Sequence, residues 1–207
     1  MQRDHLRQFL ILVFALLIPC FGVWWVASAL LALPVTGFIN TVLTLWFPDV
    51  VQALYTDGSD TLLMTEFGDR DGVLIPLDQA EYRLGFPIDT RLLSYSIPFY
   101  SALHFATPRS DGYLNSWVWG VVILYPLFAL GMLTICLKQL MTGLGVHFLD
   151  QTGVWVPDAN LIALSYQLSV LIVPTVAPIL LWLWQGRNTV LLKDVLSRLD
   201  NKPARDS

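Results

Sequence analysis

The residues of this chain that could do covalent chemistry are its two cysteines and two of its histidines. Cys20 and Cys136 are candidate nucleophiles, and His104 and His147 are candidate bases for activating a thiol. Cys136 and His147 are the one pair expected near a common surface. No spacing supports a cysteine–histidine dyad, and both cysteines stand in apolar runs, where a thiol usually behaves as a small inert hydrophobic group. The sequence therefore does not favour an enzyme, and a membrane thiol enzyme is the weakest of the alternatives.

Motifs for cofactors and nucleic acids are missing from the sequence. We find no metal-ligand spacing, no Walker loop and no dinucleotide fingerprint. The net charge is −4, and no basic stripe of the kind that binds nucleic acid is present. We expect no cofactor, no metal site and no nucleic-acid partner.

Composition indicates an integral membrane protein. Of the 207 residues, 55% are hydrophobic and 14% are charged, whereas about a quarter of a soluble domain is charged. The mean hydropathy is +0.59. Membrane lipid is therefore an expected partner.

Four uncharged segments are long enough, or nearly long enough, to cross a bilayer, which takes roughly 17–25 helical residues. They predict an α-helical protein with four transmembrane helices in a single membrane domain. The helices are expected at about residues 8–33, 91–108, 113–137 and 160–185. The segment 91–108 is the shortest, and it contains Pro98 and His104.

The first uncharged run continues to Pro48 and allows two interpretations. A second crossing would need a turn at Pro34 and Gly37. We prefer a re-entrant or interfacial helix for TGFINTVLTLWF, because this stretch is too short to cross alone and ends in an aromatic anchor followed by proline. The run after Arg7 exceeds the roughly 7–15 residues of a signal-peptide core, so an uncleaved anchor is expected.

Charge predicts the orientation, because short loops rich in lysine and arginine stay in the cytosol. Residues 49–89 carry nine acidic side chains against Arg70 and Arg83, which is typical of a translocated segment. Both termini are therefore predicted to be cytoplasmic in a bacterial inner membrane. The basic residues on the cytosolic side would be Arg3, Arg7, Arg109 and those of a tail, 187–207, whose VLLKDVLSRL predicts a short amphipathic helix.

The acidic insertion, about residues 49–90, has the pattern of a small sheet. DTLLMTEF, GVLIPL and AEYRLGF are short, partly alternating runs separated by turn residues at 69–72 and 78–79. They predict a small antiparallel sheet. A second outer loop, about 139–158, is expected along the interface with Trp155 near the headgroups.

Lys138 closes the uncharged run of the third predicted helix and would emerge near the outer interface. It could snorkel to water, or it could pair with a carboxylate of this chain or of a partner, with Gln139 adding a hydrogen bond. Polar residues of two other helices would lie at a similar depth and form a polar cluster. Ordinary interhelical hydrogen bonding and a substrate site are both compatible with that cluster. Its members are Ser94, Tyr95, Ser96, Ser165, Tyr166, Gln167 and Ser169.

Segments along nearly the whole chain resemble the exosortase H-associated membrane proteins. They are LRQFLILVFALLIPCFGVWW, LWFPDVV, RLLSYSIPFYSALHFATPR, LKQL and LIALSYQLSVLIVPTVAPILLWLWQGR. The resemblance implies an accessory protein of a Gram-negative protein-sorting system, in which a transpeptidase-like exosortase recognises a C-terminal tripartite signal. The enzyme would then be the partner. The matched polar positions, and thus the implied binding residues, are Ser94, Tyr95, Lys138, Gln139, Tyr166 and Gln167.

The sequence therefore predicts a non-catalytic accessory membrane protein that interacts with an exosortase or with its sorted substrates. A transporter or lipid-modifying component with a polar site near the outer leaflet is the alternative. It would require the polar cluster to line a cavity rather than to tie helices together.

Overall fold

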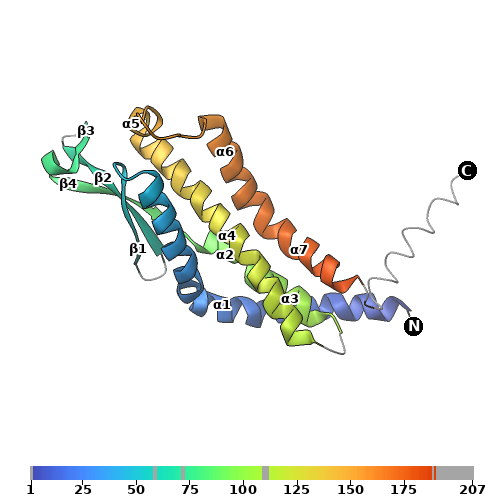
Figure 1. Ribbon diagram of the computed structural model, residues 1–207. Coiled ribbons are helices and arrows are strands. Elements are labelled where there is room, and N and C mark those ends of the chain that lie inside the picture. Colours follow the sequence, from blue (N-terminus) through green and yellow to red (C-terminus); the bar gives the residue numbers. More distant parts are fainter. Residues whose placement is uncertain (1, 58–59, 71–72, 109–111, 188, 190–207) are drawn as a thin grey trace, which may run out of the picture. The chain divides into compact units, whose positions relative to one another are not determined.

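The computed structural model describes residues 2–57, 60–70, 73–108, 112–187 and 189, with the side chains of 2–5, 57 and 60 left aside. The turn at Arg109 and the predicted amphipathic tail helix lie outside these residues. The elements (Figure 1) are α1 (Gln2–Trp46), β1 (Val51–Asp57), β2 (Asp60–Arg70), β3 (Val73–Pro76), η1 (Leu77–Gln79), β4 (Tyr82–Ile88), α2 (Arg91–Ser94), α3 (Ser96–Ala106), α4 (Tyr113–Leu144), α5 (Val146–Leu149), α6 (Ala159–Gln167), η2 (Leu168–Ile172) and α7 (Val173–Gly186).

In the part of the chain that the structure describes, three helical stretches are long and apolar enough to span a membrane. They are Leu6–Trp46, Tyr113–Leu144 and Ala159–Gly186, the last formed by α6, η2 and α7 together. The π-helical turn η2 precedes Pro174, whose ring and missing N–H disturb the regular ladder of hydrogen bonds. Three of the four predicted spans thus fall inside long apolar helices.

The segment 91–108 takes a different form, because it is divided into α2 and α3. The helix α3 has 11 residues, about 16 Å of length, which is half of a hydrocarbon core of about 30 Å. Nine of its residues are buried. A helix enclosed on almost every side is covered by protein rather than by lipid.

The helix α1 is continuous from Gln2 to Trp46. The turn at Pro34 and Gly37 that a second crossing needs is therefore absent, and that interpretation is wrong. A re-entrant segment is wrong for the same reason, whereas an interfacial position for TGFINTVLTLWF stays a prediction. The predicted break after the aromatic pair is confirmed, since the helix ends at Trp46 and Pro48 follows.

The chain divides into two compact units. The first, called here the helical unit, contains Met1–Trp25, Tyr95–Leu124 and Thr175–Ser207; the second, the sheet unit, contains Val26–Ser94 and Tyr125–Pro174. Each has its own apolar core. Phe9, Leu103 and Trp182 belong to the core of the helical unit, and Leu63 and Met132 to that of the sheet unit.

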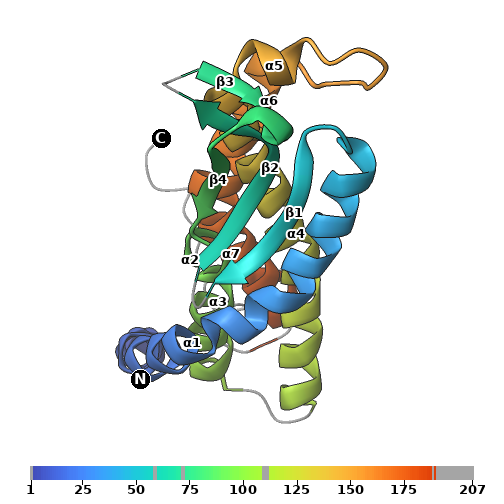
Figure 2. The same cartoon turned by 90° about the vertical axis from the view of Figure 1, so that its left-hand side faces the viewer.

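The predicted antiparallel sheet is confirmed, with β2 as its central strand. On one side β2 pairs with β1 and, further along, with β3; on the other side it pairs with β4. The strand β1 was not expected. Figure 2 shows β1 beside the C-terminal half of α1, so the sheet lies against a helix of its own unit.

Three glycines of α4 receive one large side chain each from the segment β4–α2–α3. Phe86 packs on Gly143 and Leu93 on Gly131 in the sheet unit, and Tyr100 packs on Gly120 in the helical unit. A Cβ atom on any of these glycines would overlap the incoming side chain. The close approach of this segment to α4 therefore depends on the three positions having no side chain.

Candidate partner-binding surface and buried polar groups

Lys138 is half-buried on α4, and its ammonium lies over the ring of Tyr166 from α6. The distance from Nζ to the ring centroid is 5.5 Å, within the range of a cation–π contact. Among the residues that the structure describes, no carboxylate forms an ion pair with Lys138. The cation is thus held by an aromatic face and keeps the capacity to bind an anion.

Gln139, beside Lys138, contacts the sheet instead. Its Nε2 donates to the carbonyl oxygen of Pro87 on β4, at 3.4 Å. The carboxamide therefore covers part of a sheet edge, a role that the sequence did not indicate.

The other predicted site residues are dispersed. Ser94 is buried in α2, and Gln167 is exposed on α6. Tyr95 belongs to the helical unit, where its hydroxyl forms a 2.9 Å hydrogen bond with the hydroxyl of Thr175. Of the six predicted residues, the structure brings Lys138 and Tyr166 into direct contact.

The helical unit contains a hydrogen-bond network that was not predicted from the sequence. The hydroxyl of Tyr100 donates to Gln185 Oε1 at 2.6 Å, and Gln185 Nε2 donates to the carbonyl of Ser116 at 3.1 Å. Tyr100 also contacts His104 Nδ1 at 3.2 Å, one helical turn away on α3. These contacts tie α3 to α4 and α7.

His104 is fully buried in this network. Its Nε2 donates to the carbonyl oxygen of Tyr113, at 3.0 Å, because a carbonyl can only accept. The spacing of Tyr100 and His104, four residues apart in an apolar segment, was the available signal. Because these groups bond one another, the contacts favour interhelical bonding over a substrate cavity in this unit.

The candidate thiol chemistry has no geometric support. Cys136 is fully buried in the apolar core of the sheet unit. His147 is exposed on α5 with its ring against Phe67, 5.8 Å between centroids. Within the part of the chain that the structure describes, no group of three acidic, histidine or cysteine side chains is arranged to hold a metal ion.

Comparison with protein families matches residues 3–189 to the exosortase H-associated membrane proteins. The chain belongs to this family. The resemblance noted in its sequence is thereby confirmed. The curated proteins contain no match to this family member, and the solved structures contain none either.

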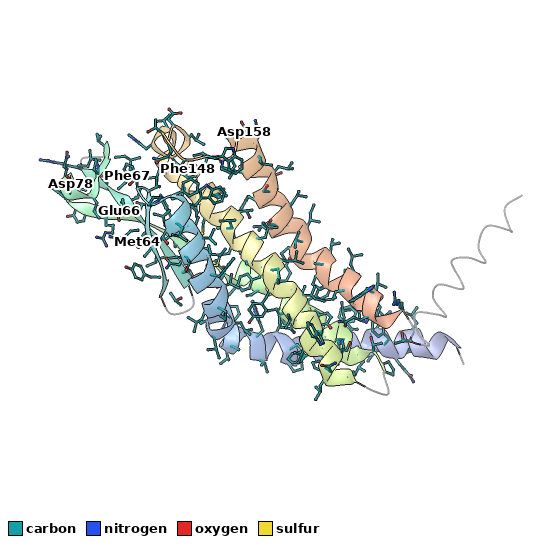
Figure 3. The ribbon with its side chains drawn as sticks, in the orientation of Figure 1. Met64, Glu66, Phe67, Asp78, Phe148 and Asp158 are labelled. Carbon is teal, nitrogen blue, oxygen red and sulfur yellow. The ribbon has the colours of Figure 1, made fainter. Side chains whose placement is uncertain are left out.

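Two tryptophans of the sheet unit stack on each other in this family member. Trp46 and Trp155 stack with centroids 5.8 Å apart, and Trp46 Nε1 donates to the carbonyl of Trp155 at 3.0 Å. Trp155 is 67% exposed, and its place near the headgroups stays a prediction. Figure 3 shows Glu66, Asp78 and Asp158 at the end of this unit where Phe148 also lies.

Charge differs sharply between the two units. The residues of the sheet unit include eleven acidic and four basic side chains, and those of the helical unit include five acidic and eight basic ones. Lys138 is the one lysine of the sheet unit. The candidate site is therefore a single ammonium within an acid-rich unit.

Proposed function

We propose that this protein is a non-catalytic accessory component of an exosortase-type protein-sorting system. It would bind the sorting enzyme, or the C-terminal signals of the enzyme's substrates. The observation that carries the proposal is the family match over residues 3–189, because the family is described by its association with exosortase H.

The proposed contact surface is centred on Lys138 and Tyr166, with the exposed Gln167 beside Tyr166 on α6. Ser94, Tyr95 and Gln139 stay in the proposal as partner- or substrate-binding residues, on the strength of the family resemblance of their segments. A half-buried ammonium next to an aromatic face is suited to a carboxylate on a partner, since partial burial reduces the screening of the charge by water.

The depth of Lys138 supports its access to a partner. It lies 25 residues after Tyr113 in α4, which corresponds to about 38 Å of helix, whereas the hydrocarbon core is about 30 Å thick. If α4 enters the core near Tyr113, Lys138 extends past the opposite boundary.

The proposed location is the inner membrane of a Gram-negative bacterium, with both termini in the cytosol. The excess of basic residues in the helical unit and of acidic residues in the sheet unit supports this orientation. The segment containing α2 and α3 is proposed as a fourth crossing, shielded by neighbouring helices, within a single membrane domain.

Co-purification with the exosortase tests the proposal. The full chain should retain the enzyme in mild detergent, and Lys138→Ala should reduce the amount retained by about tenfold, equivalent to about 1.4 kcal/mol of binding. Lys138→Arg should retain most of it, because the positive charge is kept. Arg83→Ala removes an exposed cation of the same unit and serves as the matched control.

Two results would contradict the accessory role. One is the absence of any enzyme in the purified complex. The other is sorting activity by the isolated chain on a substrate with the C-terminal signal, since an autonomous enzyme needs no sorting partner.

A further inference from the structure

Among the residues that the structure describes, three buried threonine hydroxyls of the sheet unit find no hydrogen-bond partner. They belong to Thr36 on α1, Thr61 on β2 and Thr90 between β4 and α2, whose exposed fractions are 4%, 1% and 1%. A buried hydroxyl without a hydrogen bond destabilises a fold, because it has lost its bonds to water and gained none in exchange. Other buried threonines of this unit do bond: Thr65 donates to the Leu84 carbonyl at 2.9 Å, and Thr134 to the Gly131 carbonyl at 2.8 Å.

The strand register brings Thr61 and Thr90 to one place. Thr61 stands opposite Ile88 in the pairing of β2 with β4, and Thr90 follows Ile88 by two residues. Thr61 shares a face of β2 with the buried Leu63 and Thr65, since alternate residues of a strand point to the same side. Its hydroxyl therefore points into the core of the sheet unit.

Thr36 reaches the same end of the sheet from α1. Asn40 Oδ1 accepts from the backbone N–H of Leu54 at 2.7 Å, which fixes α1 alongside β1. Thr36 lies one helical turn before Asn40, about 6 Å along the axis, and two residues of strand cover about 6.6 Å. This places Thr36 level with Thr56, whose partner in β2 is Thr61.

We propose that the three hydroxyls line an internal hydration site that holds ordered water between α1, the sheet and the start of α2. Each hydroxyl can donate one hydrogen bond and accept two. Water supplies both roles and is small and neutral, and an internal water typically makes about three hydrogen bonds to buried polar groups. A lipid chain would leave all three hydroxyls unbonded. The site lies where β4 passes into α2, and it is independent of the proposed partner-binding function.

Hydroxyl-radical footprinting of the wild-type full chain in detergent tests the site directly, because radicals formed from bound water label adjacent side chains. Ile88 lies opposite Thr61 and is 1% exposed. Its labelling rate should be higher than that of a side chain buried to this extent without bound water beside it. Phe148 is equally buried in the same unit and serves as the reference. Each rate is taken relative to that of the unfolded chain. Protection of Ile88 equal to that of Phe148 would overturn the proposal.

Isosteric replacement gives a second test, because a hydrated site and a dry site predict opposite changes in melting temperature. Thr61→Val and Thr90→Val should each lower the melting temperature of the purified full chain by about 2–8 °C, because each removes a hydroxyl that bonds the water and leaves the water without that partner. Thr61→Ser and Thr90→Ser keep the hydroxyl and should lower it less. A rise in melting temperature for the valine variants would show that the hydroxyls are dry and unbonded, and it would overturn the proposal.

Discussion

Asn40 and Gln139 are polar residues of apolar helices, and each satisfies a backbone group of the sheet. Asn40 accepts from the Leu54 N–H on β1, and Gln139 donates to the Pro87 carbonyl on β4. Both strands pair with β2 on their other side. Unpaired groups at a sheet edge invite pairing with other chains, so these two contacts help to close the edges.

Asn40→Leu should lower the free energy of unfolding by about 1–3 kcal/mol, because a backbone N–H in a part-buried position would lose its acceptor. Asn40→Asp keeps the acceptor and should cost less. Unfolding by denaturant in detergent micelles provides the measurement. Asn115→Leu, at an exposed position of α4, is the control, and an equal loss for Asn40→Leu and Asn115→Leu would contradict the edge contact.

Side-chain direction was the part of the site that the sequence did not reveal. Apolar runs correctly placed Lys138 and Tyr166 on different helices, and these residues meet. The same depth argument grouped Tyr95 with them, yet its hydroxyl bonds Thr175, 80 residues away. The rotation of one helix relative to another is set by packing, and packing cannot be derived from the spacing of residues along a single helix.

At the scale of elements, the glycines of α4 explain how a short, enclosed helix fits beside a long one. Phe86, Leu93 and Tyr100 are seven residues apart, and each fills the space above one glycine of α4. Interfaces between membrane helices are enriched in small residues for this reason, since they let backbones approach closely.

Gly131→Ala and Gly143→Ala should each lower the free energy of unfolding by about 1–3 kcal/mol, the usual cost of overpacking. The added methyl group of Gly131→Ala would overlap Leu93, and that of Gly143→Ala would overlap Phe86. Gly37→Ala in α1 is the matched control, because nothing lies within 4 Å of its added methyl group. Equal effects at Gly131 and Gly37, measured by thermal unfolding, would contradict the packing.

The strands β2, β3 and β4 could be predicted because their runs alternate and are bounded by turn residues. The strand β1 could not, since its register with β2 shifts between Val51 and Ala53, and the bulge at Gln52 interrupts the alternation. The segment 91–108 was predicted as a span from its lack of charge. Composition does not distinguish a helix covered by lipid from one such as α3 that is covered by protein.

At the scale of the whole molecule, the distribution of charge coincides with the division into two units. The sheet unit contains four basic and eleven acidic residues, whereas basic residues predominate in the helical unit. Translocation across the inner membrane selects against lysine and arginine, so this partition supports an outer location for the acidic insertion.

Membrane-impermeant thiol labelling of intact spheroplasts tests this topology in a Cys20→Ala, Cys136→Ala background. Asp78→Cys in the acidic insertion should be labelled, and Ser207→Cys at the end of the chain should be labelled only after lysis. Asp78 is exposed in η1, so failure to label it would result from its side of the membrane and not from burial. Labelling of Ser207→Cys before lysis would reverse the proposed orientation.

Photo-crosslinking in cells tests the central claim most directly, namely that the Lys138 and Tyr166 surface contacts the sorting machinery. A photoreactive residue at Gln167, exposed beside Tyr166, should crosslink to the exosortase or to its signal-bearing substrate. Thr41 is exposed on α1 of the same unit and serves as the control position. The photoreactive residue in place of Thr41 should crosslink about tenfold less, as expected for a difference of about 1.4 kcal/mol in contact free energy. No crosslink from Gln167, or equal yields from Gln167 and Thr41, would contradict the account.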